Sequence, residues 1–124
     1  MHLGDNPNFY DPIKWSGLSA VLPVKISTNQ NEGAVLIIET TEIQTLADWQ
    51  AHRITLDGFH IGFLKETNAS SLQIHKLLIP RDLIKNGVPQ KLAIEVVGRG
   101  PGLEDDFILK TISMEGAKIT IGWN

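Results

Sequence analysis

The clearest pattern in this chain is a pair of alternating apolar and polar runs on either side of Asp57-Gly58. Because Asp and Gly accept the positive backbone angles of a two-residue turn, the pattern predicts a β-hairpin over residues 52–64. The pairs expected on its apolar face are Leu56–Phe59, Ile54–Ile61 and His52–Phe63. The residues expected on its polar face are Arg53, Thr55, His60 and Gly62. One buried face and one wet face are typical of an antiparallel sheet.

Further short runs, separated by turn residues, predict strands along most of the remaining chain. With the two arms of the hairpin they make about eight strands, which also cover 18–26, 34–39, 72–79, 92–96, 107–114 and 118–123. The run 34–39 is almost continuously apolar, which is typical of a central strand. Pro23 lacks a backbone donor and predicts an edge position for its strand. A change of apolar parity between Ile74 and Leu77 predicts a bulge or a switch of facing.

The helical content expected from the sequence is small. Pro80 and the Asn86-Gly87 pair suit the start and the stop of one short helical turn near 80–86. Residues 40–50 fit either a helical turn or an irregular crossover. No segment is long enough for the helix of a parallel βαβ unit, so the pattern predicts an all-β, antiparallel β-sandwich.

The composition is that of one folded domain. With 124 residues, 42% of them hydrophobic, the chain is long enough to bury a core. Residues 1–16 are expected to form an extended N-terminal arm on a single sandwich domain at 17–124. The chain contains no cysteine, which excludes disulfides, thiolate chemistry and a thiolate zinc site.

Charge and hydropathy restrict the partners. The net charge is -3 and no basic stripe is present, which argues against nucleic acid. No run approaches the roughly 20 apolar residues of a membrane helix, so we expect no membrane span. Residues 1–11 lack the parts of a secretory signal. As given, the chain is expected to be cytoplasmic, or extracellular if it belongs to a longer protein or is exported without a cleaved signal.

Three segments resemble the galactose-binding-domain-like β-sandwich, a jelly roll found in many carbohydrate-binding modules. Residues 54–62 are similar to the hairpin of those domains, with its Asn-Gly or Asp-Gly turn. Residues 79–87 and 90–96 are similar to their short turn and the core strand after it, although Val88-Pro89-Gln90 replaces the usual Asn. Residues 105–112 resemble the strand that ends the domain. The resemblance covers 49–114 and implies a jelly roll that binds a sugar or a lipid headgroup, or has a purely structural role.

Four residues are candidates for ligand contacts, namely Trp49, Arg53, His60 and Arg99. An exposed indole stacks on the apolar face of a pyranose, and Arg and His bind hydroxyl or carboxylate groups. Arg53 and His60 share the polar face of the hairpin, although an ordinary solvated strand face carries the same residue types. Trp49 fits a core role or a ligand role. Arg99 lies between glycines, where it fits a ligand contact or a solubilising loop tip.

An acidic run after this glycine-rich loop offers candidate metal ligands. Asp105 and Asp106 supply the carboxylate oxygens that calcium prefers, so a structural calcium ion is one hypothesis and a charged loop is the other. Further oxygen ligands are available near the N-terminus, at Asp5, Asn6 and Asp11. A histidine metal site is not expected, because the hairpin register sets His52 and His60 on opposite faces.

No nucleophile motif or evident acid pair indicates catalysis, so the chain is not expected to be an enzyme. The function expected from the resemblance is non-catalytic, lectin-like carbohydrate binding, with a glycan as the ligand. The alternative is a structural or assembly domain. In that case the arm at 1–16 covers an edge strand of a second copy and makes a homo-oligomer.

Overall fold

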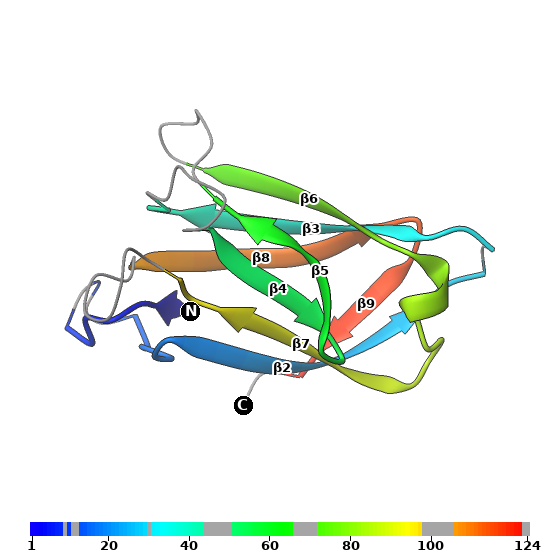
Figure 1. Cartoon of the computed structure of the whole chain (residues 1–124), viewed down its shortest axis with the longest axis horizontal. Helices are drawn as coiled ribbons and strands as arrows, with labels where there is room; N and C mark the ends of the chain where they lie inside the picture. Colours follow the sequence, from blue (N-terminus) through cyan, green and yellow to red (C-terminus); the bar gives the residue numbers. More distant parts are fainter. Residues whose placement is uncertain are drawn as a thin grey trace.

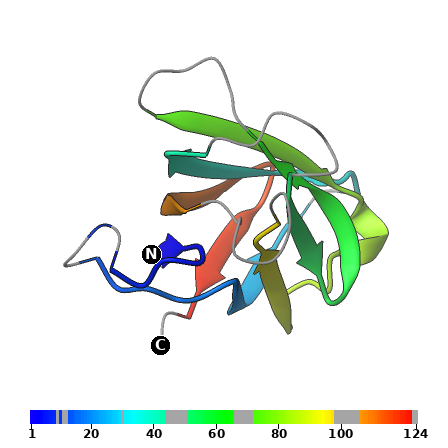
Figure 2. The same cartoon turned by 60° about the vertical axis from the view of Figure 1, so that its left-hand side comes forward.

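The structure, a computed structural model, describes residues 1–8, 10, 13–29, 31–43, 51–65, 72–97 and 106–122. In this part of the chain nine strands form two antiparallel sheets that face each other (Figures 1 and 2). Sheet A has the order β1 (His2–Leu3), β8 (Phe107–Glu115), β3 (Ala34–Thr41) and β6 (Gln73–Ile79). Sheet B has the order β5 (Phe59–Leu64), β4 (His52–Leu56), β7 (Pro89–Glu95), β2 (Ser19–Ser27) and β9 (Lys118–Ile121).

This strand order is that of a jelly roll. Orders 1-8-3-6 in one sheet and 5-4-7-2 in the other arise when the chain winds between two sheets as nested Greek keys. The predicted all-β sandwich is therefore confirmed, with β9 added beside β2. A 3-10 turn, Arg81–Leu83, lies inside the helical turn expected near 80–86. Within the described ranges, no helix is long and apolar enough to cross a membrane.

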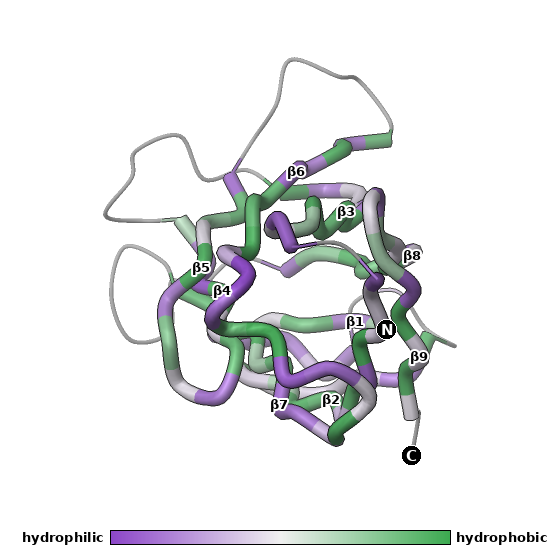
Figure 3. Tube along the Cα trace, turned by 90° about the vertical axis from the view of Figure 1, so that its right-hand side faces the viewer, coloured by the Kyte–Doolittle hydropathy of each residue, from purple (hydrophilic) through white to green (hydrophobic). Residues whose placement is uncertain are grey.

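The core lies between the sheets because most of the strands alternate between more and less buried positions. The residues of β2 that face inward are Ala20, Leu22, Val24 and Ile26, as predicted. β3 is the central strand expected from its apolar run, with β8 and β6 on either side. Its inward residues are buried and its outward residues half-buried. Figure 3 shows hydrophobic and hydrophilic residues alternating along the strands around the interior.

The change of facing predicted for β6 was wrong. β6 pairs with β3 in unbroken register from Gln73 to Ile79. Gln73 and His75 point inward and are buried, whereas Ile74 and Leu78 are exposed. The inward polar side chains are hydrogen-bonded to Thr40 and to the backbone after β3, so polar residues replace apolar ones on this part of the inner face.

The edge position predicted from Pro23 holds for only half of β2. The strand lies between β7 and β9. However, β9 pairs only with the stretch from Val24 to Ser27. The ladder stops at Pro23, whose carbonyl accepts a hydrogen bond from the Gly122 amide at 2.9 Å. The missing donor of proline thus coincides with the end of the pairing.

The segment predicted to be an N-terminal arm begins with a strand of the sandwich. β1 pairs with β8, and both His2 and Leu3 are fully buried. The Trp15 indole nitrogen donates to the Gly4 carbonyl at 2.8 Å, which ties the later part of the segment to the residues after β1. The first residues of the segment therefore pack on the body of their own chain.

The sandwich has two distinct ends. At the hairpin end lie the β4–β5 turn at Asp57-Gly58 and the 3-10 turn. At the opposite end, which we call the connection end, β3, β5 and β7 finish and β4, β6 and β8 begin (Figure 1). The connection end comprises residues 40–43, 51–53, 63–65, 72–75, 95–97 and 106–108.

Candidate functional site

The β4–β5 hairpin is fixed at its turn by Asp57. Asp57 and Gly58 have φ values of 50° and 84°, as the two central residues of a tight hairpin turn require. The Asp57 carboxylate accepts hydrogen bonds from the Lys91 amide and from the Gln90 side chain, both at 2.9 Å. These two donors, with help from the nearby Lys85 ammonium, hold the pKa of Asp57 below its ordinary value. The turn is therefore anchored on β7.

The predicted pairing of the hairpin is correct only next to the turn. Leu56 pairs with Phe59 as expected, but the register shifts between Ile54 and Thr55. Ile61 has no partner in this register and acts as a bulge. Beyond it, the observed pairs are Ile54–Gly62, Arg53–Phe63 and His52–Leu64 in place of Ile54–Ile61 and His52–Phe63.

Gly62 explains why the bulge is tolerated at this point. A Cβ atom on Gly62 would lie 2.5 Å from Leu77 Cδ2, so β6 packs directly over the glycine on the inner side. Gly62 thus faces inward, contrary to the prediction that placed it on the polar face. The shift also moves Phe63 to the outside, and its side chain is 41% exposed. A glycine inside a strand is a known sign of a bulge or a close approach, and this signal could have revealed the shift.

The shift assembles a small polar and aromatic surface on the outside of sheet B. We call it the hairpin outer face, and it consists of Arg53, Thr55, His60 and Phe63. Arg53 lies directly across from Phe63, and Thr55 lies across from His60. The rings of His60 and Phe63 have centroids 4.5 Å apart at an angle of 57°. Two of the four sequence-predicted ligand residues, Arg53 and His60, are thus brought together, and Phe63 is the member that sequence reasoning missed.

The hairpin outer face continues across the sheet. On β7, Glu95 lies opposite Arg53 and Ala93 lies opposite Thr55. On β2, Val21 pairs with Ala93 and is 59% exposed. A guanidinium, a carboxylate, a hydroxyl and an imidazole therefore border a partly exposed aromatic ring. Such a set offers donors, acceptors and an apolar contact on one surface.

The other two predicted ligand residues, Trp49 and Arg99, lie outside the described residues. The same is true of Asp105, one of the two candidate calcium ligands. By sequence, Trp49 belongs to the connection between β3 and β4, and Arg99 and Asp105 belong to the connection between β7 and β8.

Asp106 is described, and it joins the N-terminal strand to β8. Its Oδ1 atom lies 2.6 Å from His2 Nε2 and accepts the Asn6 amide at 3.2 Å. A hydrogen bond to the Asp106 carboxyl raises the pKa of Asp5, and burial and the Asp106 charge act in the same direction. Asp106 therefore lies beside Asp5 and Asn6, two of the residues predicted to share a calcium site with it.

The calcium hypothesis itself stays a prediction. In the described ranges no three histidine or acidic side chains are grouped so that they could hold a metal ion. The Asp106 carboxylate binds His2 and the Asn6 amide, so its observed contacts fasten β1 to β8. The predicted separation of His52 and His60 is confirmed, since His52 is fully buried in β4 and His60 is exposed on β5.

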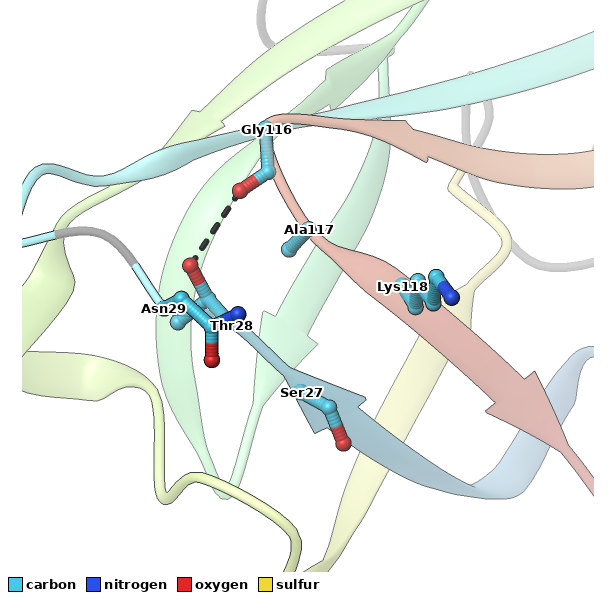
Figure 4. A pocket seen from close by; sticks show the side chains of 6 residues that line it. All are labelled: Ser27, Thr28, Asn29, Gly116, Ala117 and Lys118. Atoms are coloured by element: carbon cyan, nitrogen blue, oxygen red, sulfur yellow. Dashed lines mark hydrogen bonds between the residues drawn. The ribbon is translucent and has the colours of Figure 1, made fainter.

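A shallow hollow of about 510 Å³ lies at the far end of β2, away from the hairpin outer face (Figure 4). Its lining residues are Ser27, Thr28, Asn29, Gly116, Ala117 and Lys118. The Thr28 hydroxyl donates to the Gly116 carbonyl at 3.2 Å across one side of the hollow. The Thr28 hydroxyl is thus engaged in holding the β8–β9 turn.

Comparison with known proteins adds no relative to this picture. No protein-family model matches the chain, and neither a curated protein nor a solved structure matches it.

Proposed function

We propose that this protein is a non-catalytic carbohydrate-binding module that holds a glycan on the hairpin outer face. The observation that carries the proposal is the position of Phe63, which is 41% exposed beside the His60 ring and directly across from Arg53. An aromatic ring bordered by charged and hydroxyl side chains matches the two surfaces of a sugar. The ring takes the apolar C–H face, and the polar groups take the hydroxyls.

Two further points support a sugar as the ligand. The resemblance of residues 54–62, 79–87, 90–96 and 105–112 to galactose-binding-like domains implies this function, since some members of that class bind sugars. The backbone of Arg53 is paired with Phe63 and Glu95, but its side chain makes no hydrogen bond or ion pair to another described residue. It can therefore donate to a ligand without first losing an internal partner. Each such bond replaces one to water, so the net gain is about 1 kcal/mol and the affinity is modest.

The direct test is a glycan array probed with the folded chain, in calcium and again with a chelator. We expect hits that share one terminal sugar, and calorimetry then gives the affinity of the chain for that sugar. Phe63→Ala and Arg53→Ala should each weaken binding about tenfold, which corresponds to about 1.4 kcal/mol. Leu78→Ala removes an apolar side chain that is even more exposed, at 65%, from the outer face of sheet A and is the control.

The outcomes separate the parts of the proposal. A blank array from folded protein, or wild-type affinity in both hairpin variants, contradicts it. Trp49→Ala and Arg99→Ala test the two predicted contacts outside the described residues. If the chelator abolishes binding or lowers the thermal midpoint, the structural calcium ion predicted at Asp105 and Asp106 gains support, and no change in either argues against it.

A second candidate is assembly with further copies, and β6 favours it. β6 is a seven-residue edge strand of sheet A, and its outward positions Ile74 and Leu78 are 51% and 65% exposed. Regular edge strands with apolar side chains invite pairing with another chain. Light scattering tests this candidate: a concentration-dependent dimer that Ile74→Glu dissolves supports it, and a monomer at high concentration rules it out. Truncation of residues 1–16 tests exchange of β1, with folding checked separately because His2 and Leu3 are buried.

A further inference from the structure

A chain of hydrogen bonds crosses the interior at the connection end. The Gln73 side chain brackets the backbone of Ile43, because its Oε1 accepts the Ile43 amide and its Nε2 donates to the Ile43 carbonyl, both at 3.0 Å. Gln73 is 4% exposed and Ile43 is 1% exposed. The Gln73 side-chain amide thus bonds the Ile43 backbone amide and carbonyl as a paired strand would. It fastens the residues after β3 to the beginning of β6.

These hydrogen bonds of Gln73 determine which ring nitrogen of His75 carries a proton. Because the Ile43 backbone fixes which atom of the Gln73 amide is oxygen, Oε1 can only accept hydrogen bonds. Thr40 Oγ1, at 3.2 Å, must therefore donate its proton to Oε1. The Thr40 oxygen then accepts from His75 Nε2, which lies 2.9 Å away. Nε2 of His75 consequently carries a proton, and the ring is neutral as long as Nδ1 carries none.

Among the described residues, nothing around His75 is a counter-ion for the protonated ring. His75 is 7% exposed, and its cross-strand partner on β3 is Ile38. The titratable group that faces it from sheet B is His52 on β4, which is fully buried. In the described part of the chain, no carboxylate is hydrogen-bonded or ion-paired to His75. A proton added to Nδ1 would create a buried cation with a second imidazole as its neighbour.

His52 in turn holds another part of the connection end. Its Nδ1 accepts the backbone amide of Val97 at 3.1 Å, just after β7. Its ring stacks on Phe107 of β8, with centroids 4.5 Å apart and planes at 22°. Two buried imidazoles therefore lie where two connections between strands begin, at Ile43 after β3 and at Val97 after β7.

We propose that this cluster is an acid-sensitive latch: protonation of His75 releases Ile43 and the first residues of β6 from the sandwich. β6 is the strand that can yield, because it is the edge of sheet A and pairs only with β3 among the described strands. Opening of Gln73 and His75 toward water hydrates the imidazolium. It also breaks the bracket on Ile43 and leaves the core of sheet B intact.

The electrostatics agree in sign with this mechanism. Burial, and to a smaller extent His52, lower the pKa of His75 to about 4. The open state regains the ordinary pKa near 6.5, so it binds the proton more tightly than the closed state. Opening is therefore favoured progressively as the pH falls from about 6.5 to about 4, and the latch is fully closed above this window.

Amide hydrogen exchange, followed by NMR and corrected for intrinsic rates, tests the latch. In the wild-type chain the protection of the Ile43 amide should fall by up to about fortyfold between pH 6.5 and 4.5. The protection of amides in β2 and β7, such as Val24 and Leu92, should fall less. The matched control is His75→Gln, which keeps a donor for Thr40 but cannot titrate, and Ile43 should then keep its protection throughout.

Two results would overturn the latch. One is an Ile43 amide that stays equally protected at both pH values. The other is a His75→Gln protein that loses protection just as the wild type does. If the variant fails to fold, the His75 ring can be titrated directly in the wild type. A midpoint near 6.5 with unchanged Ile43 protection contradicts the proposal, and a midpoint near 4 together with Ile43 protection that falls from about pH 6.5 downward supports it.

Discussion

The two ends of the sandwich are each organised by a buried glutamine, and they differ in the titratable partner. At the connection end Gln73 brackets Ile43 and joins His75 through Thr40. At the hairpin end Gln90, which is 2% exposed, accepts the amide of Lys85. Its Nε2 atom donates to the Leu83 carbonyl and to Asp57 Oδ2, both at 2.9 Å.

The difference shows how one fold can use the same amide for two purposes. Asp57 is ionised in its place because Lys91, Gln90 and Lys85 stabilise the carboxylate. His75 is neutral in its place because burial penalises its charged form. Both ends therefore need a deprotonated side chain, but Asp57 and His75 become protonated in different ranges of pH. The hairpin end keeps its charge below pH 3.8, the ordinary pKa of Asp57, whereas the connection end weakens from about pH 6.5 downward.

The largest effect is expected from Gln90→Ala. The substitution removes three hydrogen bonds and leaves the Lys85 amide and the Leu83 carbonyl without these partners at partly buried positions. We expect the free energy of unfolding to fall by about 3 kcal/mol. Urea unfolding measures this. A loss below about 1 kcal/mol would mean that Gln90 does not organise the hairpin end.

Asp57→Asn should have the next largest effect. Asparagine tolerates the positive φ of the turn, but its amide nitrogen would meet the Gln90 donor in place of an acceptor. We expect a loss of about 2 kcal/mol at pH 7, measured by urea unfolding. The difference from wild type should shrink below pH 3.8, where the wild-type carboxylate becomes protonated. A difference that stays constant with pH would contradict the role given to the charge.

The pH dependence of stability separates the two ends. Between pH 7 and pH 5 the free energy of unfolding of the wild type should fall by at most about 2 kcal/mol. In this range His75 binds a proton in the unfolded chain, but it stays neutral in the folded chain because its pKa is lowered to about 4. His75→Gln should show a flat profile in that range, and Asp57→Asn should keep the wild-type slope. Denaturant titrations at a series of pH values give these slopes. Equal slopes in the wild type and the His75 variant would remove the distinction between the ends.

The smallest effect concerns the backbone of the hairpin end. Gly87 has a φ of 70°, and a Cβ atom there would meet nothing within 4 Å. Gly87→Ala should therefore cost about 1 kcal/mol through backbone strain alone. A thermal melt should show the loss without any change in its pH dependence between pH 7 and pH 5. A larger loss would reveal a contact that the geometry does not show.

Sequence reasoning succeeded where local chemistry decides the structure. The turn at Asp57-Gly58 is predicted because these residue types accept the positive φ angles observed there, and the inward face of β2 is predicted from its strict alternation. Prediction from sequence failed where packing against another strand determines the structure. The bulge at Ile61 depends on how β6 packs over Gly62, and this contact joins residues that no local pattern connects.

The same limit applies to β6 and to the candidate site. Gln73 and His75 look like outward residues in the sequence, and only their hydrogen bonds to Thr40 and Ile43 account for their burial. On the hairpin outer face, Arg53 and His60 are predicted together because pairing about the Asp57-Gly58 turn sets them on one face. Phe63 was assigned to the core, since its exposure results from the bulge.

NMR mapping shows whether the hairpin outer face binds a glycan, as we propose. The backbone amide spectrum of the chain is recorded during titration with the strongest sugar from the array. We expect the largest shifts at Arg53, Thr55, His60 and Phe63, with smaller ones at Ala93 and Glu95. Shifts confined to other surfaces, such as the hollow at Thr28 and Lys118, or no shifts with any sugar, would contradict it.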